Sequence, residues 1–358
     1  MFRLFIILII FSTHATAQTA IPFDSPRWTI QAEEAVQEAH LGQPALRVKR
    51  GGVVLKDANF RNGVIEFDIA LSNGRYFPSV NFRMQDEFNY EQYYLRPHQS
   101  GNPDAMQYTP VWNGLGGWQL YYGAGYNNPV PLPVDRWLHV RLVVKDKQAE
   151  VYLNKKDTPV LFIRELKRDV ASGMIALVNG APATAWFSNF SYSADDQVTL
   201  KSRPEPVAPL PAGTITAWQV SNVFTEKSLA GKTWLKPEDA GALTWKTLEA
   251  DYNGITDLSM LAGVTQDSNT VFVRKIIEAD QPGIRKLSFG FSDRAKVYLN
   301  NKLLYAGEDV FMSRDYRFLG TVGYWDAVYL DLKKGRNELW IAVSETFGGW
   351  GVKAKLEE

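Results

Sequence analysis

The feature that most limits what this chain can fold into is a short hydrophobic alternation that recurs along most of its length. Runs of about six residues place apolar side chains at every second position, the period of a strand that buries one face. Turn signals such as Asn73-Gly74 and Asn179-Gly180 separate these runs. Strands are expected at residues 64–71, 79–85, 90–98, 118–122, 137–145, 149–153, 174–178, 270–277, 286–291, 295–299, 328–332 and 338–343.

Helical periodicity is weak throughout the chain. Its best example is the short stretch of residues 30–39. The pattern therefore predicts an all-β fold built from β-sandwich or jelly-roll units.

A proline-rich segment divides the chain. Residues 201–211 read KSRPEPVAPLP, and such spaced prolines favour an extended, semi-rigid spacer that cannot enter the middle of a sheet. A chain of 358 residues is also too long for one ordinary hydrophobic core. We therefore expect a sandwich at residues 18–195, a linker at 196–213 and a jelly roll at 214–358.

The first residues resemble a secretory leader. Phe2 and Arg3 precede an apolar run at residues 4–11, and Ala15-Thr16-Ala17 follows it as a small-x-small cleavage motif. Residues 1–17 are thus predicted to be a signal peptide. The run is far shorter than the roughly 20 residues that span a bilayer. We expect export to the periplasm or the extracellular space, with no membrane span after cleavage.

Composition excludes several function classes. The chain has no cysteine, so disulfides, thiolate metal sites and cysteine nucleophiles are not available to it. Basic and acidic residues balance at 39 each, which argues against a nucleic-acid partner. The 11 Trp and 16 Tyr are numerous enough either to fill two cores or to stack on sugar rings.

Four segments of the first unit carry a family resemblance. They are GVIEFDI at residues 63–69, PVDRWLHVRL at 133–142, AEVYLN at 149–154 and AWFSNF at 185–190. In this order they resemble the concanavalin A-like lectin/glucanase superfamily, in its laminin-G-like branch with 3-keto-disaccharide hydrolase-type domains, over residues 20–195. The resemblance implies a sandwich, and the superfamily includes lectins, hydrolases and adhesion modules alike.

The second unit resembles the galactose-binding-like jelly rolls that accompany glycoside hydrolases. The segments FGFSD at residues 289–293, KVYLN at 296–300 and LKKGRNEL at 332–339 carry this resemblance. It covers residues 214–358 and implies a non-catalytic module.

The resemblance raises the question of glucanase chemistry. Retaining glucanases need two carboxylates about 5 Å apart on one strand face. Glu66 and Asp68 fit the first two positions of the E-x-D-x-E or E-x-D-x-x-E motif, but Ala70 and Leu71 stand where the second glutamate of either form is required. Standard glucanase catalysis is therefore not expected, and Glu66, Asp68 and His98 are kept only as catalytic candidates.

Strand parity indicates a ligand-binding face instead. Val80, Phe82 and Met84 form an apolar face, which sends the side chains between them to the other side. If the three strands at residues 64–71, 79–85 and 90–98 are neighbours, their polar faces combine. The cluster would contain Glu66, Asp68, Asn81, Arg83, Tyr94, Arg96 and His98. Such a set suits sugar hydroxyls, although ordinary cross-strand ion pairs would produce the same pattern.

Residues 97–125 are rich in aromatic side chains and glycine. The glycines would let a loop approach a ligand, and the rings could form a stacking rim. Trp112 is expected to be more exposed than Trp118, since it precedes the turn Asn113-Gly114. Alternatively, the rings fill the core and the glycines serve turns.

Metal and cofactor motifs are absent from the sequence. It has no P-loop, GxGxxG, HExxH or GxSxG motif, and Asp195-Asp196 is interpreted as a solvated pair, so no metal and no cofactor are assigned. The sequence favours an exported protein that binds a glycan or a small sugar derivative. A hydrolase or lyase acting on a modified sugar and a scaffold that contacts a protein partner remain the alternatives.

Overall fold

The computed structural model describes residues 18–180, 182–314 and 319–357. Strands account for most of its regular structure, so the prediction of an all-β fold of sandwich-like sheets is confirmed. The predicted signal peptide at residues 1–17 lies outside the described residues. No helix in the described ranges is long and apolar enough to cross a membrane.

The first half of the chain forms one strongly curved sheet of 14 strands. Its main path runs β12-β11-β10-β4-β14-β3-β13-β5-β6-β7-β8, with β1, β2 and β9 attached beside it. The strands are β1 (Thr19–Ala20), β2 (Trp28–His40), β3 (Gln43–Phe60), β4 (Gly63–Leu71), β5 (Ser79–Asp86), β6 (Asn89–Leu95), β7 (Met106–Trp112), β8 (Leu115–Gly116), β9 (Asn127–Asn128), β10 (Trp137–Lys145), β11 (Gln148–Leu153), β12 (Leu161–Ile163), β13 (Gly173–Asn179) and β14 (Ala185–Ala194).

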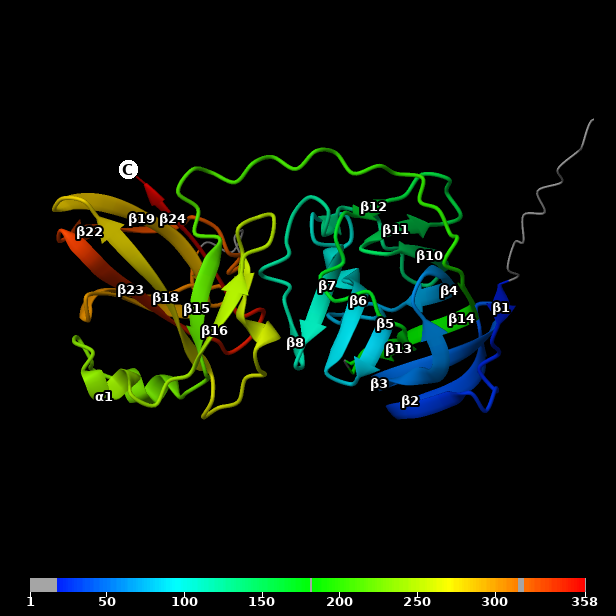
Figure 1. Ribbon diagram of the computed structural model, residues 1–358. Coiled ribbons are helices and arrows are strands. Elements are labelled where there is room, and N and C mark those ends of the chain that lie inside the picture. Colours follow the sequence, from blue (N-terminus) through cyan, green and yellow to red (C-terminus); the bar gives the residue numbers. More distant parts are fainter. Residues whose placement is uncertain (1–17, 181, 315–318, 358) are drawn as a thin grey trace, which may run out of the picture.

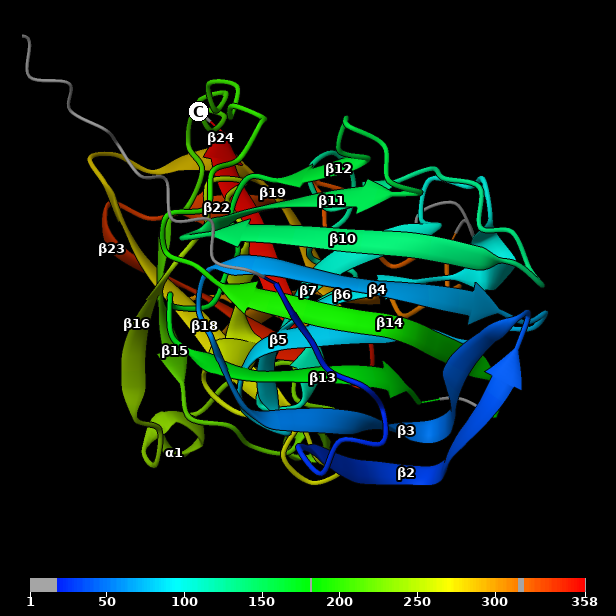
Figure 2. The same cartoon turned by 90° about the vertical axis from the view of Figure 1, so that its right-hand side faces the viewer.

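The long strand β3 turns this sheet into two layers. Its first part pairs with β14 at Leu46 and Val48, and its second part pairs with β13 from Gly51 onward. Figure 2 shows β10, β4 and β14 in the layer that faces the viewer, with β6 and β7 behind it. Apolar side chains from both layers share one core.

The alternation that predicted these strands is visible in their burial. In β4, Ile65, Phe67 and Ile69 are buried in the core, whereas Glu66 and Asp68 between them are partly exposed. Burial of one face is what holds a strand of this pattern in register.

The second half of the chain forms a six-stranded and a four-stranded sheet. Its strands are β15 (Ala217–Ser221), β16 (Trp245–Glu249), β17 (Thr256–Asp257), β18 (Thr270–Ala279), β19 (Gly283–Ser292), β20 (Arg294–Leu299), β21 (Lys302–Glu308), β22 (Asp326–Leu332), β23 (Gly335–Ser344) and β24 (Gly351–Glu357). The helices are the short α1 (Pro237–Ala240) and three 3₁₀ turns, η1 (Pro97–Gln99) in the first half, and η2 (Glu226–Leu229) and η3 (Leu258–Met260) here. Trp218, Phe289, Phe291 and Trp350 lie in the core between the two sheets.

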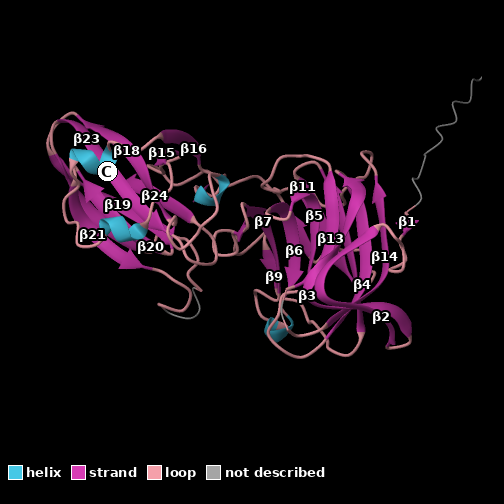
Figure 3. Cartoon of the chain, turned by 90° about the horizontal axis from the view of Figure 1, so that it is seen from below, coloured by secondary structure: helices cyan, strands magenta, loops and turns pink. Residues whose placement is uncertain are grey.

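The two groups of sheets lie side by side (Figures 1 and 3), and the proline-rich segment passes along one side of the molecule from the first group to the second (Figure 1). Strands up to Ala194 belong to the first group, and strands from Ala217 onward belong to the second. The exact domain boundaries remain a prediction. We call the two groups the first and second β units.

The aromatic and glycine-rich segment joins the two units. Gln119 donates its backbone N–H to the Gly348 carbonyl at 2.9 Å, and the Tyr121 hydroxyl donates to Asp257 Oδ2 at 2.9 Å. A side chain at Gly349 would place its Cβ 3.0 Å from the Gly117 Cα, so glycine permits this close approach.

Two expectations about secondary structure are wrong. Residues 30–39, the best helical candidate, lie within strand β2, which pairs with β3 along its length. Residues 118–122, expected to be a strand, form turns because their backbone bonds to the second unit and to local carbonyls instead of a sheet neighbour.

Candidate functional site

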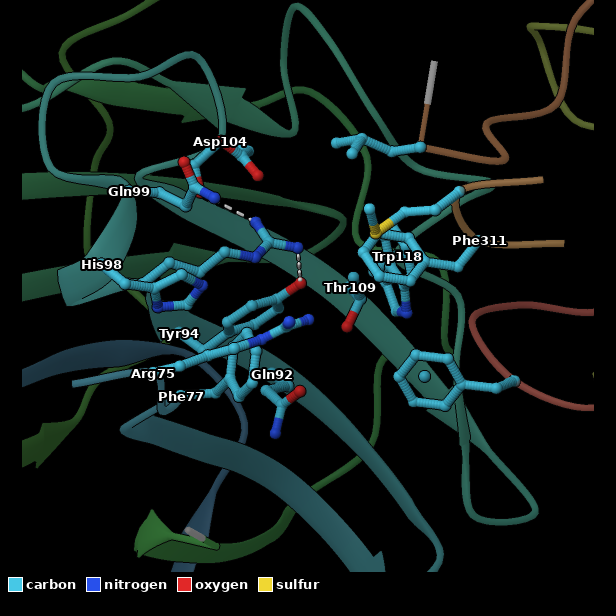
Figure 4. Close-up of a pocket in the computed structure, with 15 residues that line it drawn as sticks. Arg75, Phe77, Gln92, Tyr94, His98, Gln99, Asp104, Thr109, Trp118 and Phe311 are labelled. Carbon is cyan, nitrogen blue, oxygen red and sulfur yellow. Dashed lines mark hydrogen bonds between the residues drawn. The ribbon is translucent and has the colours of Figure 1, made fainter. Parts of the chain in front are cut away.

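A cavity of about 480 Å³ lies where the two β units meet (Figure 4). The first unit provides most of its lining, from β6, β7 and the loops beside them. The second unit contributes Phe311, Met312, Leu319 and Phe347. A ligand in this space would touch both units.

The floor of the cavity is the outer face of β6 and β7. Tyr93 points into the core of the first unit, so its neighbours Gln92 and Tyr94 project outward on the other side of the strand. Thr109 of β7 is paired with Gln92 and extends the same face. Strand alternation thus places an amide, a ring and a hydroxyl together.

Arg96 lies directly after β6 and forms part of the wall. Its Nη2 donates to the Tyr94 hydroxyl at 2.6 Å and to Gln107 Oε1 at 2.6 Å, and its Nη1 donates to the Asp104 carbonyl at 2.9 Å. Its guanidinium also lies 4.7 Å from the centre of the Tyr94 ring and 5.9 Å from that of Trp118. These contacts hold a buried cation in one orientation.

His98 stands on the short turn η1 beside Arg96. Its ring meets Phe77 edge-on at 5.4 Å between ring centres. Burial lowers the pKa of His98 below its usual value, and the charges of Arg75 and Arg96 lower it further. The imidazole is therefore uncharged at neutral pH and presents both a donor and an acceptor.

Aromatic rings from both units surround the opening. Trp118 lies 5.7 Å from Phe311 and 6.0 Å from Phe347, measured between ring centres. Phe77 borders the other side and is 40% exposed. The cavity thus combines flat apolar surfaces with hydrogen-bonding groups.

Three of the ligand-binding residues predicted from the sequence meet in this cavity. Tyr94, Arg96 and His98 all line it. They do not share a strand face as expected, because β6 ends at Leu95 and His98 lies on the turn η1. Asn81 lies next to the floor and accepts a hydrogen bond from Gln92 at 3.1 Å, but it does not line the cavity.

The structure contradicts the expected position of Arg83. The pairing of β5 with β6 is irregular between Phe82 and Asp86, and Arg83 has φ of 50°. Because of this irregularity, the Arg83 side chain lies on the side of β5 opposite to the one expected. Its guanidinium donates to the Arg61 carbonyl and to Asn62 Oδ1 inside the protein. A bulge changes which face a side chain occupies.

The two carboxylates of the predicted cluster do not lie near the other members. Strands β14, β3 and β13 separate β4 from β5, so Glu66 and Asp68 lie in the layer that faces away from the second unit (Figure 2). Asp68 Oδ1 lies 2.7 Å from His139 Nδ1. Glu66 Oε1 lies 3.8 Å from Arg141 Nε. His139 and Arg141 are the cross-strand neighbours of these carboxylates on β10. The pairs are therefore the ordinary cross-strand ion pairs that the sequence left open as an alternative.

Trp112 does not line the cavity either. It is half-buried, and the Arg168 guanidinium lies 4.0 Å from the centre of its ring. Trp118, which was expected to be less exposed, is also half-buried and lines the cavity. The turn after Trp112 packs against the second unit, where Asn113 Nδ2 donates to the Ser259 carbonyl at 2.8 Å.

Sequence reasoning missed the lining residues that need knowledge of distant contacts. Arg75 and Phe77 come from the loop before β5, and Phe311 and Phe347 come from the other unit. The available signal was the local density of rings and glycines around Trp118. In the described residues, no group of three or more His, Cys, Asp or Glu side chains could hold a metal ion.

Comparison with known proteins reveals similar folds of low identity. No protein-family model matches the chain, and no curated protein matches its sequence. A carbohydrate-binding module, CBM66 from Bacillus subtilis, is 19% identical with a TM-score of 0.36 and aligns 47% of this chain with 96% of its own. A putative glycosyl hydrolase from Parabacteroides distasonis is 14% identical, with a TM-score of 0.36 and coverages of 47% and 93%.

A β-glucanase from Bacillus licheniformis is a third similar structure. It is 11% identical with a TM-score of 0.34, and the alignment covers 50% of this chain and 98% of the glucanase. These similarities are too distant to assign an activity. The superfamily resemblances of the two units remain predictions.

Proposed function

We propose that this protein binds a carbohydrate in the cavity between its two β units. The observation that carries the proposal is the convergence there of exposed aromatic rings with an amide, a hydroxyl, a guanidinium and an imidazole. Sugar rings offer apolar C–H faces that stack on aromatic side chains. Their hydroxyls need several oriented donors and acceptors, which such a lining provides.

The division of roles follows from the geometry. Trp118 provides the flat surface, and Gln92, Thr109 and His98 provide hydrogen-bonding groups around it. Arg96 is held by three hydrogen bonds, so it loses little side-chain freedom when a ligand binds. A fixed guanidinium contributes to both affinity and orientation.

This proposal does not require Glu66 or Asp68, which are engaged on the outer face of β4. It includes the export predicted from the leader sequence, because extracellular and periplasmic glycans are then within reach. A cavity between two units also explains why a chain with two sandwiches would hold them in contact. The second unit completes the binding wall.

The test compares two tryptophan variants on a glycan array. Trp118→Ala removes the stacking surface and is expected to weaken binding roughly tenfold. Trp112→Ala is the matched control, since this half-buried ring lies under Arg168 outside the cavity. Thermal denaturation of both variants checks that they fold. Equal binding by wild type and Trp118→Ala, or no binding to any glycan, would contradict the proposal.

A further inference from the structure

Arg96 is a buried cation whose hydrogen-bond acceptors are all neutral, although the Asp104 carboxylate lines the same cavity. The residue is 5% exposed, and its acceptors are a carbonyl, a phenol and an amide oxygen. It forms no salt bridge with any of the residues that the structure describes. Buried cations are usually paired with an anion, because neutral acceptors replace water only in part.

The guanidinium also has unused donors. Of the five N–H groups of an arginine, three are engaged by the Asp104 carbonyl, Tyr94 and Gln107. The remaining two have no acceptor within the described parts of the chain. Since Arg96 lines the cavity, a ligand atom can supply the missing acceptor.

A second arginine stands at the mouth of the same cavity. Arg75 is exposed, and its guanidinium lies 5.7 Å from the centre of the Phe311 ring. It too has no carboxylate partner among residues 18–180, 182–314 and 319–357. The described lining thus holds two guanidinium groups and one carboxylate, that of Asp104, which leaves an excess of positive charge.

We infer that the sugar recognised here is acidic and that its carboxylate binds to Arg96 and Arg75. The inference rests on the proposed carbohydrate-binding function and specifies its ligand class. A hydroxyl would satisfy an N–H group but would leave the buried charge uncompensated, whereas a carboxylate does both. Gln92, Thr109 and Asp104 remain for the hydroxyls of the same sugar. A hexuronic acid has this combination of groups.

The experiment uses matched pairs of oligosaccharides and isothermal titration calorimetry. Tetrasaccharides of galacturonic, glucuronic and mannuronic acid are each compared with their carboxyl-reduced, neutral counterparts. We expect at least one acid to bind about tenfold more tightly than its neutral counterpart. Arg75→Gln should remove most of this preference, because it deletes one of the two cations in the lining, and thermal denaturation checks that the variant folds.

Arg203→Gln is the control, since it removes the same charge from the exposed linker. It should preserve the preference. Arg96→Lys keeps a charge in the wall and should retain part of the preference, whereas Arg96→Gln should lose it.

Two results would overturn the inference in distinguishable ways. Equal or tighter binding of the neutral sugars refutes the acidic ligand and leaves the proposed function standing. Failure of every acidic and neutral sugar to bind refutes the proposed function as well. A preference for the acidic sugar that persists in both Arg75→Gln and Arg96→Gln also contradicts the inference, because other residues would then bind the carboxylate.

Discussion

Tyr94 lies on strand β6 as the alternation predicts, whereas Arg96 and His98 lie beyond the end of that strand, where the turn η1 places His98. The position of Arg83 does not follow from the alternation, because a single irregularity in β5 sends its side chain to the opposite side. Bulges depend on how two strands pair, which no local pattern reveals. From the sequence, Trp118 could equally be a core residue, because the rings that it contacts belong to the second unit and are distant in the chain.

Glu345 provides a test of a buried carboxyl group. Its side chain is fully buried beside Asp293, and burial together with the Asp293 charge raises its pKa to about 8. The folded state therefore retains a proton that the unfolded chain releases near the usual glutamate pKa. The stabilisation from this proton is complete at low pH and is lost as the pH rises through about 8.

The prediction is that wild type loses about 2 kcal/mol of unfolding free energy between pH 6 and pH 8 through this group. Glu345→Gln, which keeps the shape without the charge, should lack this loss. Urea denaturation at both pH values measures it. An unchanged pH dependence in the variant would show that Glu345 is ionised in the fold at neutral pH.

Individual strands were the most predictable part of the structure. Residues 270–277, 286–291 and 338–343 were all expected as strands and lie within β18, β19 and β23. β2 was misjudged because its partly exposed side chains, Glu33, Glu34 and Gln37 among them, do not alternate cleanly. Its conformation is set by pairing with β3, which is a tertiary effect.

Strand order could not be read from the pattern. The sequence neighbours β4 and β5 lie far apart in the sheet, because β14, β3 and β13 pass between them. Alternation fixes which face of a strand is buried but not which strand lies beside it. The residues of the predicted polar cluster therefore lie on two separate surfaces, one with Glu66 and Asp68 and one with Tyr94 and Arg96.

The start of β4 offers a test of backbone geometry. Gly63 has φ of 135°, and a Cβ added there would lie 1.8 Å from the Ser193 carbonyl of β14. Gly63→Ala should therefore destabilise the first unit by more than 2 kcal/mol, roughly the limit for left-handed strain alone. Gly42→Ala is the control, since Gly42 has φ of 75° with no atom near its Cβ position. Urea denaturation measures the unfolding free energy of both variants. Equal losses in Gly63→Ala and Gly42→Ala would contradict this account.

The two β units are held together by specific polar contacts as well as by rings. Lys167 of the first unit, with 6% of its side chain exposed, pairs with Asp251 of the second at 2.8 Å between Nζ and Oδ2. Its ammonium also lies 4.4 Å from the centre of the Tyr252 ring. The prolines indicated a division of the chain, but nothing in the linker revealed that the units meet.

Breaking this pair should weaken the whole molecule. Lys167→Met leaves Asp251 without its partner and is expected to cost about 3 kcal/mol of stability. Adding Asp251→Asn to this variant removes the unpaired charge and should restore part of the lost stability. Differential scanning calorimetry measures both. The contact would be unimportant if Lys167→Met left the unfolding transition unchanged.

The central claim is that the cavity shared by the two units is where a sugar binds. Hydrogen-exchange mass spectrometry with and without a bound glycan tests its position directly. The account predicts slower exchange in residues 92–99 of the first unit together with residues 344–349 of the second. Slower exchange confined to β4 and β10, around Asp68 and His139, would contradict it.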